Sequence, residues 1–262
     1  MGQTFRADVF FEGKNTQFLL NDISDEMQRY PAHGKFYEHD QLIVHRQLIP
    51  KEGMAIIDVG SNIGNHALFY SVHTDARKIF CFEPNPIACA LLRKNVEINS
   101  ETKIDLTYAE YGCGDERQRC RVVQMPGNLG GATLKADDSG DGLVDVMPLD
   151  SILLNEPISF IKIDVEGMEL NVLGGASAIL HRYRPCIAVE VMNENHSAFW
   201  TWCVTNNYHI LHAFRMYWSA MNYVCVPKTK PVDTVETQAE LHRFWKSEYQ
   251  DRRRESLLVK SI

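Results

Sequence analysis

Long apolar runs are the first feature that this 262-residue chain lacks. A membrane-spanning helix needs about 20 consecutive apolar residues, and no run approaches that length. The first residues also lack the apolar segment of a signal peptide, and Arg6 occupies the position where a myristoylation signal needs serine or threonine. We therefore expect a globular protein with no membrane span, no secretory leader and no myristoyl anchor.

A cysteine framework is also missing. No two cysteines have C-x-x-C spacing, their number is odd, and several lie in apolar segments; they are Cys81, Cys89, Cys113, Cys120, Cys186, Cys203 and Cys225. These features argue against both disulfides and a zinc site. We predict reduced core thiols in a cytoplasmic protein and assign no metal ligands; whether a divalent metal assists the protein's activity stays open.

An excess of positive charge is absent as well. The chain has 27 lysines and arginines against 34 aspartates and glutamates, a formal net charge of −7. That balance argues against a surface for nucleic acid or anionic membranes. With 45% hydrophobic residues, the composition is that of an ordinary globular protein, and the length suits one α/β domain with modest extensions.

The most informative stretch runs from Ile56 to Asn65. A short apolar segment predicts a buried strand, and a turn with Gly60 and Gly64 then leads into a helix. Such a turn lets a ligand approach the backbone and turns helix N–H groups toward it. The spacing is G-x-x-x-G, whereas nicotinamide-binding oxidoreductases use G-x-G-x-x-G, so that class of enzyme is disfavoured.

A second strand, residues 78–82, ends at Glu83 about 20 residues after the glycine turn. An acidic residue at this place in a nucleoside-binding fold accepts hydrogen bonds from the two hydroxyls of a ribose. Pro84 and Pro86 end the strand, which leaves the carboxylate at its tip. The alternative is a solvated charge at a strand end.

From Met54 onward, predicted strands and helices alternate, which is typical of a doubly wound parallel sheet. We predict a helix at 87–99 with a core of Leu91, Leu92, Val96 and Ile98. Further strands are predicted at 104–109, 158–164 and 186–191, a short helix at 149–154, a helix at 170–180, and a closing antiparallel pair at 208–213 and 217–226. Asp115, in the turn after the third strand, is either an adenine contact or a solvated loop residue.

Three regions surround or interrupt this alternation. Residues 1–50 are predicted to form an accessory hairpin and helix, and 51–227 the main domain. Within it, an insertion at 116–147 has two apolar segments, 121–125 and 143–147, that could pair as a ribbon over the substrate side. Residues 228–262 are predicted to form a charged helix or tail.

The second chemical centre is the segment 161–169, where Asp164, Glu166 and Glu169 are three carboxylates within six positions. Asp164 ends the fourth strand, so it should lie at the same sheet edge as Gly60 and Glu83. Mutual repulsion would raise the pKa of at least one carboxyl. Alternatively, Glu166 and Glu169 are acids that favour a helix N-terminus.

These motifs resemble those of the FkbM-type methyltransferases. The similar segments are D-V-G-S-N-I-G from Asp58, F-E-P-N-P from Phe82, Leu149-Asp150, and I-K-I-D-V-E-G-M-E-L-N-V-L-G-G from Ile161, and the likeness extends over residues 36–191. It implies a Rossmann-like α/β fold with a seven-stranded, mostly parallel sheet, helices on both faces and an antiparallel closing strand. It also implies binding of S-adenosylmethionine and O-methylation of a sugar, glycolipid or natural product.

The resemblance implies roles for individual residues. Cofactor contacts are expected from Glu38, Asp58, Gly60, Ser61, Asn62, Gly64, Asn65, Glu83, Pro84, Cys113, Asp115 and Asp164. Asp58 would reach the cofactor's amino group, and the proton acceptor would be Asp164 or Glu166, with His196 as the second choice. His66 departs from the residue usual in the family and could touch cofactor or substrate.

Two alternatives stay open at this stage. An amine loses its proton more readily than a hydroxyl, so N-methylation of a small amine competes with O-methylation. A nucleoside-binding module without catalysis also fits, because the cofactor motifs are stronger than the assignment of a base. The expected partner is a small molecule or glycan, and a homo-oligomer is left open.

Overall fold

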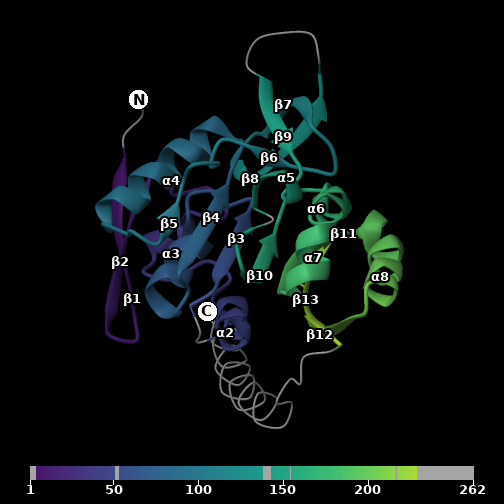
Figure 1. Ribbon diagram of the computed structural model, residues 1–262. Helices are drawn as coiled ribbons and strands as arrows, with labels where there is room; N and C mark the ends of the chain where they lie inside the picture. The colour runs from purple at the N-terminus through teal and green to yellow at the C-terminus, as the bar shows by residue number, and fades with distance from the viewer. Residues whose placement is uncertain (1–3, 51–52, 138–142, 154, 216–217, 229–262) are drawn as a thin grey trace, which may run out of the picture. The chain divides into compact units, whose positions relative to one another are not determined.

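A seven-stranded sheet forms the centre of the computed structural model, which describes residues 4–50, 53–137, 143–153, 155–215 and 218–228 (Figure 1). The strand order is β12-β13-β11-β10-β3-β4-β5. β13 runs in the opposite direction to the other six strands, so it is antiparallel to both β11 and β12. The strands are β3 (Ala55–Val59), β4 (Lys78–Phe82), β5 (Ile104–Asp105), β10 (Ile158–Ile163), β11 (Cys186–Met192), β12 (Tyr208–Phe214) and β13 (Ala220–Pro227). This arrangement confirms the predicted Rossmann-like methyltransferase fold.

Helices cover both faces of the sheet (Figure 1). One face carries α2 (His39–Leu48), α3 (Asn65–His73) and α4 (Pro86–Ile98). The other carries α5 (Asp150–Leu153), α6 (Glu169–Gly175), α7 (Ser177–Tyr183) and α8 (His196–Thr205), whose apolar side chains share one buried cluster with the sheet. Of the predicted core of α4, Leu91, Leu92 and Val96 are buried, and Ile98 is half-buried.

Alternation along the strands separates apolar from polar side chains. Ile57 and Ile161 face the cluster beneath α5–α8. Asp58 and Lys162 follow them in the chain, so they point to the opposite face, and parallel pairing places these two residues side by side. The register of β3 and β10 thus builds a polar layer beneath α2 and α3.

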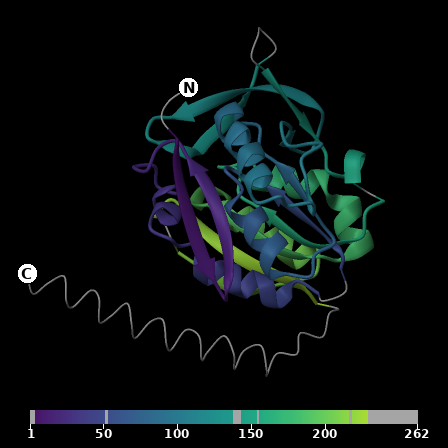
Figure 2. The ribbon, with the colours of Figure 1, turned by 90° about the vertical axis from the view of Figure 1, so that its left-hand side faces the viewer.

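The N-terminal hairpin consists of β1 (Phe5–Phe11) and β2 (Lys14–Leu20), joined by two residues with positive φ, Glu12 and Gly13. This is the two-residue turn that suits the twist of paired strands. Figure 2 shows the hairpin lying along α3 and α4. The side chains of Asn95 and Asn99 accept hydrogen bonds from the N–H groups of Leu19 and Gln17, so the hairpin forms part of one compact unit, residues 1–227.

A second sheet, of order β6-β9-β7-β8, lies above the central one (Figure 1). Its strands are β6 (Gly112–Cys113), β7 (Gln118–Met125), β8 (Asn128–Ala136) and β9 (Leu143–Met147). The predicted ribbon is therefore only partly correct. β7 lies between β9 and β8: its residues 118–121 pair with β9, and its residues 120–125 pair with β8, a glycine-containing stretch for which no strand was predicted. Cross-strand hydrogen bonds from β7 outweigh the low strand propensity of the glycines in β8.

Two further elements differ from the prediction. The third strand ends at Asp105 instead of Ala109, because beyond it the chain turns, and the Ala109 carbonyl accepts the Glu83 N–H at 2.7 Å. The helix expected at 170–180 divides into α6 and α7 at Ala176. The carboxylate of Asp150 accepts the N–H groups of Ala178 and Ile179 at 2.7 and 2.9 Å, which starts α7.

The seven cysteines are all buried, free thiols. Within the described part of the chain, no helix is both long and apolar enough to cross a membrane. The predicted charged helix at 228–262 lies, apart from Lys228, outside the described residues.

Candidate functional site

A cavity of about 440 Å³ lies at the carboxyl ends of β3, β4, β10 and β11. This is the edge at which open α/β sheets bind ligands, and the volume suits a small molecule. The second sheet and the segment before α1 (Arg29–Ala32) complete the wall. The predicted site residues that line it are Gly60, Ser61, Asn62, Glu83, Pro84, Cys113, Asp164 and Glu166.

The glycine turn forms one wall of the cavity. Gly60 has φ +76°, and a Cβ there would lie 1.8 Å from the backbone oxygen of Asp164, so only glycine fits. The N–H groups of Gly60 and Ser61 both donate to the Phe82 carbonyl, at 2.9 and 3.0 Å. These two donors belong to the turn and hold β3 against β4; the N–H groups predicted to face a ligand are those of the following helix, α3.

Glu83 stands beside this turn, 8% exposed. Its two carboxylate oxygens accept the N–H groups of Asn62 and Asn85, each at 2.8 Å. Burial raises the pKa of Glu83 to about 7, although both hydrogen bonds oppose the shift. Among the described residues, Oδ1 of Asn62 is buried without a hydrogen-bond partner, so the wall offers an unused acceptor beside Glu83.

Lys162 organises the floor of the site. Its Nζ donates to the Gly60 carbonyl at 2.6 Å and lies 3.5 Å from both Asp58 Oδ1 and Asp164 Oδ2. Burial alone would lower the pKa of Lys162, but the surrounding carboxylates, Asp164 and Asp58 foremost, raise it above its ordinary value. Asp58 is fully buried beside this ammonium and does not line the cavity, in contrast to its predicted role at the cofactor's amino group.

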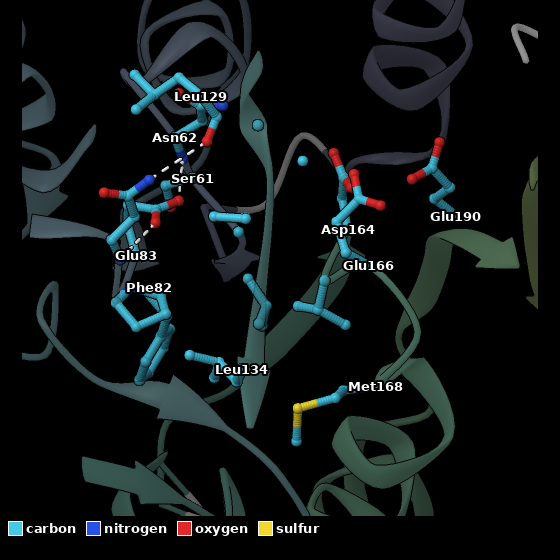
Figure 3. A pocket seen from close by; sticks show the side chains of 18 of the residues that line it. Ser61, Asn62, Phe82, Glu83, Leu129, Leu134, Asp164, Glu166, Met168 and Glu190 are labelled. Atoms are coloured by element: carbon cyan, nitrogen blue, oxygen red, sulfur yellow. Dashed lines mark hydrogen bonds between the residues drawn. The ribbon is translucent and has the colours of Figure 1, made fainter. Parts of the chain in front are cut away.

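Three carboxylates form the wall opposite Glu83, and Figure 3 shows Asp164, Glu166 and Glu190 together there. One oxygen from each lies within 4.8 Å of those of the other two. Burial, followed by repulsion from Asp164 and Glu169, raises the pKa of Glu166 to about 7. Burial and the charges of Asp164 and Glu166 also raise the pKa of Glu190. Glu190 was not among the predicted site residues, although it is an acid near the tip of the fifth predicted strand.

Glu169 has a structural position, as its alternative interpretation suggested. Its carboxylate is fully buried at the start of α6. Oε1 accepts the Met192 N–H at 3.1 Å and the Asn195 side-chain amide at 2.9 Å. These bonds tie the loop after β10 to the end of β11 and so hold Glu166 and Glu190 on adjoining walls.

Several predicted residues lie outside the cavity lining; they are Glu38, Asp58, Gly64, Asn65, Asp115 and His196. Asn65 exchanges two hydrogen bonds with the Tyr37 backbone, and Asp115 accepts one from the Asn171 amide. Nε2 of His196 lies 3.2 Å from the Val191 carbonyl, with its ring against Tyr223. His196 therefore does not reach the cavity where its predicted role as a proton acceptor would require it.

His66, the departure noted in the sequence, does line the cavity. Its Nε2 lies 3.2 Å from Glu38 Oε2. Oε1 of Glu38 accepts the side-chain amides of Gln41 and Asn222, both at 2.7 Å. Glu38 therefore fixes His66 from behind and links α2 to β13.

The remaining wall is apolar. Phe82, Leu134 and Met168 lie along one side of the cavity (Figure 3), and Cys113 joins them. Such a surface suits a flat, weakly polar ring.

Comparison with known proteins places this geometry in a family. Residues 58–225 match the family model "Methyltransferase FkbM domain". Hexuronic acid methyltransferase AglP of Haloferax volcanii is 35% identical over 136 residues, which cover 50% of this chain and 53% of AglP. 2-O-methyltransferase NoeI of Sinorhizobium fredii is 27% identical over 198 residues, which cover 63% of this chain and 76% of NoeI.

A third relative, Methyltransferase 1 of Beauveria bassiana, is 28% identical over 149 residues, or 46% of this chain and 57% of the relative. The chain thus spans little more than half of AglP and of this protein. A solved FkbM methyltransferase structure from Methylobacillus flagellatus has a TM-score of 0.49 and 22% identity, covering 66% of this chain and 43% of that one. Because the family model matches more than half of its residues, this chain belongs to the FkbM methyltransferase family.

Proposed function

We propose that this protein uses S-adenosylmethionine to methylate a hydroxyl group of a sugar, glycolipid or natural product. The observation that carries the proposal is one continuous cavity with buried Glu83 on one wall and the carboxylates of Asp164, Glu166 and Glu190 on the other. The name of AglP, a hexuronic acid methyltransferase, supports a sugar acceptor, and that of NoeI, a 2-O-methyltransferase, supports transfer to oxygen.

The lining residues fit this cofactor. Each Glu83 oxygen accepts one backbone hydrogen bond and keeps lone-pair capacity for a ribose hydroxyl. The unpartnered Oδ1 of Asn62 adds an acceptor nearby, and the apolar wall of Phe82, Cys113 and Met168 suits the adenine. When bound, S-adenosylmethionine supplies an activated methyl group on a positively charged sulfur.

The protein's own work is positioning and proton acceptance. A hydroxyl is a poor nucleophile at neutral pH and needs a base within hydrogen-bond reach. Glu166, whose pKa is about 7, can take up this proton near neutrality, and Asp164 is the alternative acceptor. Residues of β7 and β8 in the second sheet form part of the cavity wall.

We predict that Glu83→Ala weakens S-adenosylmethionine binding by about 10- to 100-fold, because hydrogen bonds to a charged acceptor contribute about 1.5–3 kcal/mol each. Calorimetric titration of wild type and variant with S-adenosylmethionine, and separately with NAD, measures this. Binding of NAD in place of S-adenosylmethionine, or equal affinity in the two proteins, would contradict the cofactor assignment.

With an acceptor identified by screening hydroxylated sugars and lipids, Glu166→Gln is expected to lower kcat by about 10²–10⁴-fold. Initial rates of methyl transfer give this number. Unchanged turnover with a hydroxyl acceptor would remove Glu166 as the base and leave Asp164→Asn to be tested. Unchanged turnover with an amine would favour the N-methylation alternative. Cofactor binding with no transfer to any acceptor would favour the module without catalysis.

A further inference from the structure

The wall opposite Glu83 carries more negative charge than its neighbours balance. Lys162 lies 3.5 Å from Asp164 but donates to the Gly60 carbonyl and also faces Asp58. In the described part of the chain, no lysine, arginine or histidine forms an ion pair with Glu166 or Glu190. The carboxyl groups without a basic partner are therefore these two glutamates, both of which line the cavity.

The fold holds the two glutamates close to each other despite their repulsion. Glu190 belongs to β11, and its register neighbour across the sheet is Asn222 of β13. Glu166 has φ +51° in the loop after β10, and Glu169 ties that loop to the end of β11. A non-glycine residue at positive φ is held there at a cost in backbone energy. The pair is thus fixed at the cavity wall without an ion pair to any basic side chain among the described residues.

A cationic ligand would relieve this repulsion, whereas a neutral ligand would not. S-adenosylmethionine and its product S-adenosylhomocysteine differ by one methyl group and by the positive charge on sulfur. A carboxylate beside that sulfur attracts the donor and gains nothing from the neutral thioether. We propose that Glu190, together with Glu166, recognises the positive charge of the sulfonium, so that the site binds the methyl donor more tightly than its demethylated product.

This inference rests on the proposed function, and it adds discrimination between cofactor and product to the same site. It also gives Glu190 a role that is separate from proton acceptance by Glu166. In the transfer, the C–S bond breaks with its electron pair left on sulfur, a C–O bond forms, and the hydroxyl proton passes to Glu166. Glu166 thus gains a proton when the sulfonium becomes a neutral thioether. The negative charge that attracted the donor is then neutralised at the stage when the product must leave.

Proton release gives an independent readout. The charges that raise the pKa of Glu190 are those of Asp164, Glu166 and Glu38, and the charges that raise the pKa of Glu166 are those of Asp164 and Glu169. The basic groups that line the same cavity are Lys162, paired with Asp58 and Asp164, and His66, beside Glu38. Burial and these charges raise the pKa of Glu166 to about 7 and that of Glu190, which also forms a hydrogen bond with Asp164, to about 10, so at pH 7 Glu166 is partly protonated and Glu190 mostly protonated. A bound cation favours the ionised carboxylates and therefore expels protons, which a neutral ligand does not.

The experiment is calorimetric titration of the full chain with S-adenosylmethionine and with S-adenosylhomocysteine at pH 7, in EDTA and in two buffers of different ionisation enthalpy. For wild type we expect tighter binding of the donor, with proton release seen as a buffer-dependent enthalpy. For Glu190→Gln we expect the ratio of the two affinities to fall by about five- to tenfold, with less proton release. Glu166→Gln should also lower the ratio of the two affinities and the proton release.

Glu194→Gln is the matched control. It removes the same charge four residues further along, from an exposed side chain outside the cavity lining, and should leave the ratio within about twofold of wild type. Donor binding with an equal ratio in wild type, Glu190→Gln and Glu194→Gln would overturn the inference and leave the proposed function intact. Absence of donor binding in wild type would overturn both. If a variant does not fold, the wild-type protein still tests the inference: a donor-binding enthalpy that does not depend on the buffer would contradict it.

Discussion

Gly60→Ala is expected to abolish cofactor binding and to lower the free energy of unfolding by about 3 kcal/mol or more. The new Cβ would lie 1.8 Å from the backbone oxygen of Asp164 and 2.9 Å from its carbonyl carbon. Both atoms belong to the backbone at the end of β10, so no side-chain rotation can relieve the overlap. The turn must move away from β10, and Gly60 would then lose the hydrogen bond from Lys162.

Gly13→Ala separates backbone strain from steric overlap. Gly13 has φ +75°, nearly the same as Gly60, but a Cβ there meets nothing within 4 Å. We expect it to cost about 1 kcal/mol and to leave cofactor affinity unchanged, since only the left-handed backbone conformation is disfavoured. Urea unfolding and titration with S-adenosylmethionine measure both variants. Equal losses in stability would show that the overlap at Gly60 is relieved elsewhere.

The parts of the fold that follow from local pattern could be predicted from the sequence. The apolar segments before Gly60, Glu83 and Asp164 are short and end in turn residues, so their strands and shared edge were evident. Asn85 caps α4 and Pro86 begins it, so β4 ends just before Glu83. These local signals placed Gly60, Glu83 and Asp164 together correctly.

What the sequence could not predict depends on register and side-chain direction. Asp58 was expected to face a ligand, but the pairing of β3 with β10 sets it against Lys162. Glu190 joins Asp164 because β11 lies beside β10, and no local pattern states which acids at strand ends converge. His196 follows β11 closely in the chain, yet its side chain turns back to the Val191 carbonyl.

The Asp58–Lys162 pair leads to the second large effect. Lys162→Met is expected to destabilise the protein by about 3–5 kcal/mol, because it leaves the fully buried Asp58 carboxylate without a cation. Neither oxygen of Asp58 has a hydrogen-bond partner among the described residues, so nothing else compensates its charge. Lys78→Met is the control. Its ion pair with Asp105, at 3.1 Å, is half-exposed, and its loss should cost under about 1 kcal/mol.

The double variant Asp58→Asn/Lys162→Met distinguishes a costly unpaired charge from lost packing. A buried ion pair gains little over neutral groups of similar volume, so removing both charges should restore most of the stability lost in Lys162→Met. Urea unfolding of the two single variants and the double variant gives the coupling energy. A double variant no more stable than Lys162→Met would mean that the ammonium stabilises the fold mainly through its 2.6 Å hydrogen bond to the Gly60 carbonyl. In that case Lys162 would stabilise the glycine turn directly, and Asp58 would serve only to keep Lys162 protonated.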